Sequence, residues 1–219
     1  MNKITIWPQQ TIPESLIKKL LDFYKDQNPR DIFNKRIHDL KGMVPQYEDV
    51  PELYDFLESL GYEFIDKNWN DGNYLETNEN YGIHADTGKD QTHTLDSTSF
   101  LIPLYMEPKC HSYLFFLNQV WNGEATTFVR QPWLQGWNYQ CSDYSDPRLE
   151  YLDPENWDDR LDHIMPQLEP ATREGMSIDS IYKWKIGSFV SFPNNRMHFA
   201  VTNSNIPKIG LAIRLKCKT

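Results

Sequence analysis

A helix is predicted near the start of the chain, over residues 12–26. Its hydrophobic residues recur every three or four positions, as on one face of a helix: Leu16, Leu20, Phe23 and Tyr24. Thr11 and Glu14 have the spacing of a capping box, in which the Thr oxygen accepts from a backbone N–H and the Glu returns to the cap. Pro13 suits the first turn of this helix.

A second helix is predicted between residue 49 and Gly61. Asp49 and Glu52 repeat the capping signal, with Pro51 inside the first turn. The hydrophobic stripe that follows consists of Leu53, Phe56, Leu57 and Leu60. Gly61 stands where a left-handed residue commonly ends a helix. We therefore expect residues 1–61 to form a helical support for the rest of the chain.

Beyond residue 62 the pattern changes to short runs of aromatic and β-branched residues, separated by Asn, Asp, Gly and Pro. These runs predict strands at 62–68, 73–83, 98–105, 112–118, 126–130, 177–184, 188–192, 197–202 and 208–216. Many short strands at this spacing favour an antiparallel sandwich or barrel. No internal repeat or linker divides the sequence, so we expect a mainly β fold with flanking helices (α+β), in one domain over 1–219.

Residues 131–180 interrupt the strand pattern and carry most of the charge. They hold eleven acidic residues and three arginines, a net charge of −8 out of −9 for the whole chain. A short helix is predicted over 152–161, capped by Asp153 with Pro154 in its first position. The segment also contains a set of large aromatic residues: Trp133, Trp137, Tyr139, Tyr144, Tyr151 and Trp157. A lid or substrate loop explains this insertion, and so does an acidic solvated surface over a small aromatic cluster.

Composition and charge exclude several classes of protein. With 39% hydrophobic and 14% aromatic residues, the chain is globular and not disordered. A net charge of −9 is unsuited to neutralising phosphates, so no nucleic-acid partner is expected. We see no signal peptide and no hydrophobic run near the roughly 20 residues that span a bilayer, so no membrane association is expected. Cys110, Cys141 and Cys217 are too scattered for a disulfide framework, which favours a cytoplasmic location.

A candidate metal site combines His84, Asp86 and His198. Two imidazoles and one carboxylate on one face of a metal leave positions open for other ligands, an arrangement that suits Fe(II) in oxygenases. His84 and Asp86 are two positions apart, so in a strand their side chains point to the same side. Of the six histidines, only His84 has an acidic residue two positions later. Such a pair also arises by chance, and a strand histidine such as His198 is more often an ordinary core or surface residue.

Four segments, in order, extend this signal: YLETNENYGIHAD at 74–86, SFLIPL at 99–104, YLFFLNQVWNGEATTF at 113–128 and WKIGSFVSFPNNRMH at 184–198. With the early Ile-Pro-Glu at 12–14, this set resembles the 2-oxoglutarate- and Fe(II)-dependent dioxygenases, nearest the prolyl 4-hydroxylase branch. The resemblance spans most of the chain outside 131–180. It implies a double-stranded β-helix, which is a cupin-like jelly roll of two sheets, with His84, Asp86 and His198 as the iron ligands.

The resemblance also implies a cation on the strand after His198 that binds the distal carboxylate of 2-oxoglutarate. Alternation within 208–216 puts Lys208 and Arg214 on one face of this strand, so both can face the interior. Lys208 lies ten residues after His198, the spacing that the prolyl-hydroxylase-like segments favour. Arg214 lies sixteen residues after it and offers the two-pronged guanidinium that suits a carboxylate. Both residues are candidates.

Two further contacts to the cosubstrate follow from the resemblance. Tyr74, ten residues before His84, matches a family tyrosine that hydrogen-bonds 2-oxoglutarate. Some relatives have a second tyrosine where this chain has Phe116, and Thr127 or Tyr113 is expected to supply the missing hydroxyl.

The activity implied by the resemblance is hydroxylation of a peptide or small molecule. Its cofactors are Fe(II), 2-oxoglutarate as cosubstrate and O₂, with ascorbate as an optional reductant, and its by-products are succinate and CO₂. Relatives that halogenate leave the carboxylate position open, so Asp86 favours hydroxylation. Two alternatives are an oxygenase for another substrate class, such as nucleobases, which the acidic charge disfavours, and a jelly-roll binding or sugar-modifying protein without oxygenase activity.

Overall fold

The computed structural model describes residues 3–27, 39–68, 70–78, 81–86, 97–120, 178–202 and 207–218. The strand predicted at 126–130 and the helix predicted at 152–161 lie outside these residues. The same is true of the acidic segment 131–180, except for its last three residues, which begin a strand.

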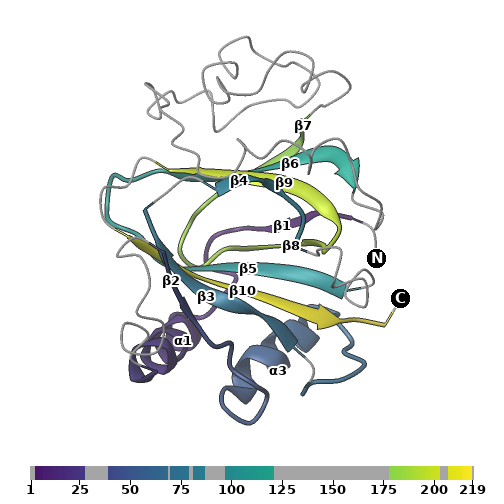
Figure 1. Cartoon of the computed structure of the whole chain (residues 1–219). Coiled ribbons are helices and arrows are strands. Elements are labelled where there is room, and N and C mark those ends of the chain that lie inside the picture. The colour runs from purple at the N-terminus through teal and green to yellow at the C-terminus, as the bar shows by residue number, and fades with distance from the viewer. Residues whose placement is uncertain are drawn as a thin grey trace.

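The described strands form two antiparallel sheets that face each other (Figure 1). The six-stranded sheet has the order β1 (Thr5–Trp7), β8 (Phe189–Pro193), β5 (Ser97–Tyr105), β10 (Lys208–Lys216), β3 (Asn70–Thr77) and β2 (Asp39–Gly42). The four-stranded sheet has the order β4 (Tyr81–His84), β9 (Arg196–Thr202), β6 (Ser112–Val120) and β7 (Ile178–Lys183). Helices α1 (Glu14–Asp26) and α3 (Pro51–Ser59) cover the outer face of the larger sheet. The predicted mainly β fold with flanking helices is thus confirmed.

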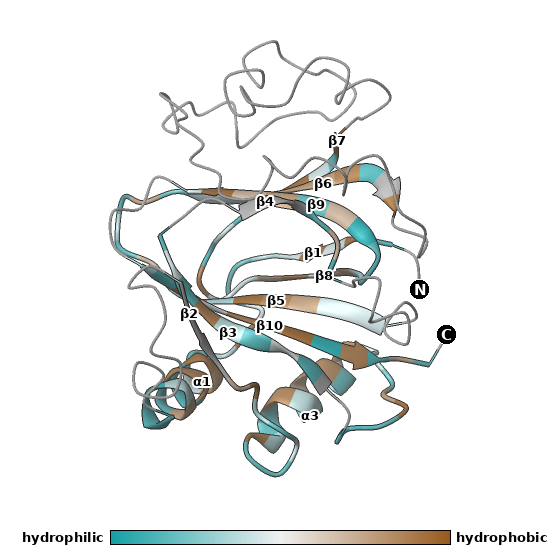
Figure 2. Cartoon of the chain, in the orientation of Figure 1, coloured by the Kyte–Doolittle hydropathy of each residue, from teal (hydrophilic) through white to brown (hydrophobic). Residues whose placement is uncertain are grey.

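Strand β10 shows how alternation separates the two sides of the six-stranded sheet. Leu211, Ile213 and Leu215 are fully buried in the cluster that includes the hydrophobic faces of α1 and α3. Lys208 and Arg214 lie on the opposite face and line a pocket between the sheets, as the alternation predicts. Figure 2 shows the complementary pattern on α1, where hydrophilic residues take the outer side. Within the described residues, no helix combines the length and the hydrophobicity needed to cross a membrane.

Both predicted capping boxes are wrong, although both helices are present. The Thr11 hydroxyl donates to the Pro8 carbonyl at 2.6 Å, in the turn before α1. The residue at the N-cap of α1 is Pro13, and no side chain caps the helix. A carboxylate oxygen of Asp49 accepts from the Gln46 backbone N–H at 2.8 Å, and α3 begins only at Pro51. Gly61 has a φ of +92° just beyond α3, which confirms its predicted left-handed conformation.

Strand boundaries differ from the predicted ones where the polar pattern is ambiguous. The segment predicted as one strand over 73–83 forms β3 and β4, which belong to different sheets. The segment 62–68 makes only an isolated bridge between Phe64 and Cys217. Strands β1 and β2 were not predicted, because three or four residues with few hydrophobic positions give too weak a signal. The sequence pattern therefore did not predict where the chain passes from one sheet to the other.

Replacing Gly72 by alanine is expected to destabilise the protein by about 2–5 kcal/mol. Gly72 has a φ of +136°, and a Cβ at this position would lie 2.1 Å from the backbone oxygen of Ala212. The cost combines backbone strain with overpacking. Urea denaturation measures it. Gly61→Ala is the matched control, because its φ is also positive but nothing lies within 4 Å of a Cβ there. Equal losses in the two variants would contradict the predicted clash.

Candidate metal centre and pocket

Cross-strand pairing brings His84 and His198 together. Strand β4 ends at His84, which pairs directly with His198 on the antiparallel neighbour β9. Directly opposite residues of an antiparallel pair project to the same face of a sheet. The two imidazole rings have centroids 4.3 Å apart. Two histidines far apart in the sequence therefore lie side by side on the inner face of the smaller sheet.

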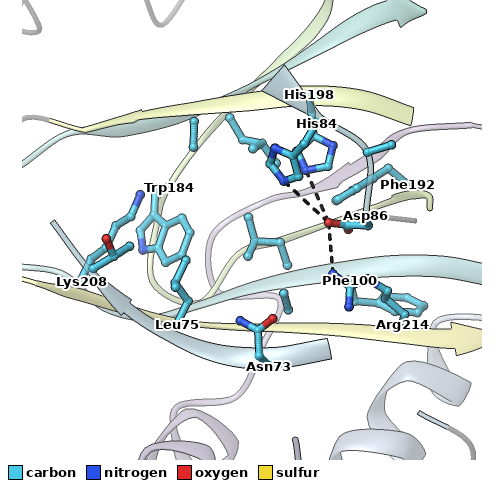
Figure 3. A pocket seen from close by; sticks show the side chains of 16 residues that line it. Asn73, Leu75, His84, Asp86, Phe100, Trp184, Phe192, His198, Lys208 and Arg214 are labelled. Carbon is cyan, nitrogen blue, oxygen red and sulfur yellow. Dashed lines mark hydrogen bonds and ion pairs between the residues drawn. The ribbon is translucent and has the colours of Figure 1, made fainter. Parts of the chain in front are cut away.

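Asp86 completes the group from a bend just beyond β4. Its Oδ1 lies 3.9 Å from Nε2 of His84 and 3.7 Å from Nε2 of His198 (Figure 3). One candidate ligand atom from each of the three side chains lies within 4.8 Å of the others. The strand expected to run through Asp86 stops at His84, so strand alternation does not orient the carboxylate. The Asp86 backbone N–H, which donates to the Asn194 carbonyl at 3.0 Å, anchors it instead.

The surroundings of His198 fix which ring nitrogen can bind a metal. Its Nδ1 lies 2.9 Å from the carbonyl oxygen of Arg196. A carbonyl only accepts, so Nδ1 carries the proton and Nε2 of the neutral ring keeps its lone pair. The rings of Phe192 and Phe116 pack on the imidazole, with centroids 4.9 and 5.8 Å away. His198 is thus held with its free nitrogen toward Asp86.

Ser99 and Asn194 hold the Asp86 carboxylate in place. The Ser99 hydroxyl lies 2.5 Å from Oδ2 of Asp86 and also contacts Oδ1 of Asn194. Asn194 is fully buried in the turn between β8 and β9. Oδ2 is therefore engaged by a hydroxyl, and Oδ1 is the oxygen that faces the imidazoles. Both residues lie in segments quoted for the family resemblance, 99–104 and 184–198, but neither was predicted to hold Asp86, because this role depends on contacts between distant segments.

We expect Ser99→Ala to weaken metal binding by about 10- to 100-fold, since partners that orient a ligand typically contribute that much. Titration with Fe(II) under anaerobic conditions, in competition with a chromophoric chelator, measures the change. Ser97→Ala is the matched control, because Ser97 is also buried on β5 and its hydroxyl has no hydrogen-bond partner among the residues that the structure describes. An equal effect of the two substitutions would show that Ser99 has no specific role.

The Asp86 carboxyl is charged at neutral pH despite its burial. Burial by itself raises its pKa, but the nearby side chains of His198, Arg214 and His84 and the hydrogen bond from Ser99 outweigh this effect. The result is a pKa lowered to about 2. A carboxylate that stays ionised is the form that binds a cation.

The candidate metal-binding group, His84, Asp86 and His198, lies at one end of a pocket of about 200 Å³ between the sheets. Lys208 and Trp184 lie at the other end (Figure 3). The walls between them are mainly hydrophobic and include Leu75, Phe100, Leu101, Leu114, Phe192, Ala200 and Ala212. Such a cavity suits a small ligand with polar groups at its two ends.

Lys208 is a buried ammonium group without a carboxylate partner among the described residues. It is 3% exposed, its Nζ donates to the Ser112 hydroxyl, and the same atom lies 4.4 Å from the centroid of the Trp184 ring. Burial lowers the pKa of Lys208 to about 7. A buried charge normally has an opposite charge beside it. The end of the pocket at Lys208 therefore favours an anionic ligand group.

Arg214 lies at the opposite end, beside the candidate metal-binding group. One of its terminal nitrogens, Nη2, lies 3.3 Å from Oδ1 of Asp86, and Nη1 lies 3.6 Å from Oδ2 of Asp71. The sequence left both Lys208 and Arg214 as candidates for one role, with a slight preference for Lys208. In the structure they occupy different ends of one pocket, so they do not serve the same ligand group.

The prediction that Tyr74 contacts a cosubstrate is wrong. Tyr74 faces helix α1, where its hydroxyl donates to the Leu20 carbonyl at 3.0 Å, and it is fully buried in the helix-covered core. Its neighbours Asn73 and Leu75 line the pocket instead. Tyr113 is not among the residues that line it either, and Thr127 lies outside the described residues.

Sequence reasoning missed three residues around Lys208. Ser112 supplies the hydroxyl near the ammonium. It lies two positions before Leu114, which lines the pocket, so strand alternation could have placed Ser112 on the same face. Trp184 covers the Lys208 side chain. Gly210 makes room for this ring, because a Cβ there would lie 2.4 Å from Cη2 of Trp184.

Comparison with known proteins adds a likeness in fold. The sequence matches no family model and no curated protein. Among solved structures it is similar to the crystal structure of a prolyl-4-hydroxylase from Pseudomonas putida, with a TM-score of 0.51 and 10% sequence identity. The alignment covers 100% of this chain and 95% of that one. At this identity the likeness concerns the fold alone.

Proposed function

We propose that this protein is a non-haem Fe(II)- and 2-oxoglutarate-dependent dioxygenase, similar to the prolyl hydroxylases, built as one double-stranded β-helix domain. It hydroxylates a peptidyl or small-molecule substrate and releases succinate and CO₂. One observation carries the proposal. A single pocket has two imidazoles and a carboxylate at one end and, at the other, the buried ammonium of Lys208, which has no carboxylate partner among the described residues.

The donor set fits Fe(II). Nε2 of His198 is free to bind, Asp86 is ionised, and His84 lies opposite His198 on the neighbouring strand. When bound, Fe(II) supplies the activation of O₂ that is coupled to decarboxylation of 2-oxoglutarate. His84, Asp86 and His198 would hold the metal, and Ser99 keeps the carboxylate oriented.

The pocket also fits a dicarboxylate. Lys208 would neutralise the distal carboxylate of 2-oxoglutarate, with the Ser112 hydroxyl beside it. The hydrophobic walls exclude water around the chain of the cosubstrate. Because the Lys208 pKa is lowered to about 7 by burial, an arriving carboxylate stabilises the protonated form. A contact from Thr127 and a supporting role of ascorbate stay predictions from the sequence.

Anaerobic titration with Fe(II) and 2-oxoglutarate tests the proposal. We expect a weak visible charge-transfer band in the wild type and its loss in His84→Ala and Asp86→Ala. Circular dichroism establishes that each variant is folded. In air, the wild type should form succinate even without substrate, slowly, and faster with a substrate found among peptides, amino acids and sugars.

A folded wild type that gives no band would contradict the proposal. It would favour the alternative of a binding or sugar-modifying protein whose histidine pair has no oxygenase role.

A further inference from the structure

We infer that Arg214 binds a carboxylate group of the substrate itself, which makes the substrate a small organic acid such as a free amino acid or hydroxy acid. The inference rests on the proposed function and specifies its substrate class. Three features of Arg214 lead to it: its place in the pocket, its unused hydrogen-bond donors and its change of electrostatic environment when a metal binds.

The place of Arg214 separates it from the cosubstrate. Lys208 already provides a cation at the far end of the pocket, where the distal carboxylate of 2-oxoglutarate is proposed to bind (Figure 3). The two residues are six positions apart on β10, so their Cα atoms are about 20 Å apart along the strand. One short dicarboxylate that binds the metal does not need both cations. Arg214 is therefore left for a second anion.

Most of the donors of Arg214 are unused. A guanidinium has five N–H donors. Its one recorded hydrogen bond among the described residues is the 3.3 Å contact from Nη2 to Asp86. Nη1 is 3.6 Å from Asp71, beyond hydrogen-bond range, and Nε is buried with no partner in the part of the chain that the structure describes. The side chain is only 14% exposed, so few of these unused N–H donors can bind water. A carboxylate accepts two parallel hydrogen bonds and therefore suits the unused donors of this guanidinium.

A bound metal would leave Arg214 with less anionic charge around it. In the described residues, the negative charges beside it are Asp86 and Asp71. A divalent cation held by Asp86 offsets that carboxylate, and Asp71 is 37% exposed, so solvent screens it. With a metal bound, the end of the pocket at Arg214 then favours an anion.

The position of Arg214 also limits the size of the substrate. Nη2 lies 3.3 Å from the Asp86 oxygen that faces the imidazoles, and divalent metals bind carboxylate oxygens at about 2 Å. A carboxylate held by Arg214 therefore lies close to the metal position. The carbon to be hydroxylated must then lie only a few bonds from that carboxylate, as in an amino acid or a hydroxy acid.

Binding of matched acid and amide pairs tests this inference. The probes are the standard L-amino acids and a set of short hydroxy acids, each paired with its primary amide, added to protein that contains Zn(II) and saturating 2-oxoglutarate. Saturation-transfer NMR detects binding, and calorimetry gives affinities. We expect at least one acid to bind at least tenfold more tightly than its amide. Arg214→Gln should remove this preference, and Arg214→Lys should retain part of it, because lysine keeps the charge without the fork.

Lys183→Gln is the matched control, because it removes one positive charge from β7, outside the pocket, and should leave the preference intact. The comparison of acids with amides in the wild type needs no variant and stands even if Arg214→Gln fails to fold. Equal affinities for acids and amides, or no binding of any acid, would overturn the inference. So would a loss of 2-oxoglutarate affinity in Arg214→Gln as large as that in a Lys208 variant.

The charge-transfer band distinguishes a failure of this inference from a failure of the proposed function. If the band forms but acids show no advantage over amides, the inference alone fails. If the band does not form but an acid still binds through Arg214, the proposed function fails and the carboxylate site stands.

Discussion

Replacing Asp86 by asparagine is expected to lower the affinity for Fe(II) by at least about 100-fold, more than the loss of an orienting partner typically causes. Asparagine has nearly the same shape as aspartate and can still accept from Ser99, so the substitution mainly removes the charge. Among the described residues, Asp86 is the carboxylate whose Oδ1 lies within 4 Å of Nε2 of both imidazoles, and it stays ionised despite its burial. Anaerobic chelator competition measures the affinity, and the Fe(II)–2-oxoglutarate band should disappear with it.

Asp71→Asn is the matched control for this prediction. Asp71 also lies beside Arg214, with Oδ2 at 3.6 Å from Nη1, but it is not part of the three-residue group. Its replacement changes the net charge by the same amount and should leave metal affinity within about threefold of the wild type. If Asp86→Asn binds Fe(II) as tightly as Asp71→Asn does, the three side chains are not the metal site.

The residue types of the candidate metal-binding group were predictable from the sequence, but the contacts that assemble it were not. A histidine followed two positions later by an aspartate is a local signal, and it indicated His84 and Asp86. The expected cause of their convergence, alternation along one strand, differs from the observed one. Strand β4 ends at His84, and contacts with Asn194 and Ser99 position Asp86. Contacts of this kind depend on register between strands that are distant in the chain.

The inner and outer faces of β10 were predictable because period-two alternation is a property of the strand itself. The same rule was not applied to β3, where a family resemblance put Tyr74 on the inner side. Asn73 and Leu75 line the pocket, so Tyr74 must face the helices, where it donates to Leu20. A residue that is matched to a family position only by its distance from a motif can thus lie on the wrong face of its strand.

The separation of Lys208 from Arg214 is a three-dimensional fact that spacing alone could not provide. Both distances from His198 were acceptable for a cation that binds 2-oxoglutarate. In the structure, Lys208 and Arg214 lie at different ends of the pocket and beside different groups, which indicates different roles. Ser112 and Trp184 surround one cation, whereas Asp86 and Asp71 lie beside the other.

Lys208→Met is expected to weaken binding of 2-oxoglutarate by at least about 30-fold, because removing one partner of a buried charge pair typically costs 2 kcal/mol or more. Methionine keeps an unbranched side chain against Trp184 but lacks the charge. Without 2-oxoglutarate the variant should be as stable as the wild type or more stable, because it no longer buries an unpaired ammonium. Calorimetry on the Zn(II) protein measures affinity, and thermal unfolding measures stability. Lys183→Met, which replaces a lysine that lies over Tyr113 outside the pocket, should leave the affinity unchanged.

The pH dependence of binding supplies an independent readout for Lys208. Burial lowers its pKa to about 7 in the free protein, and a bound carboxylate raises the pKa again, so binding takes up a proton above pH 7. The affinity of the wild type should therefore fall as the pH rises from 7 to 9, by up to about tenfold per pH unit. Both carboxylates of 2-oxoglutarate are already ionised in this window and do not contribute. Lys208→Met should show a flat profile, and a wild-type affinity that is constant from pH 7 to 9 would contradict the proposed charge pair.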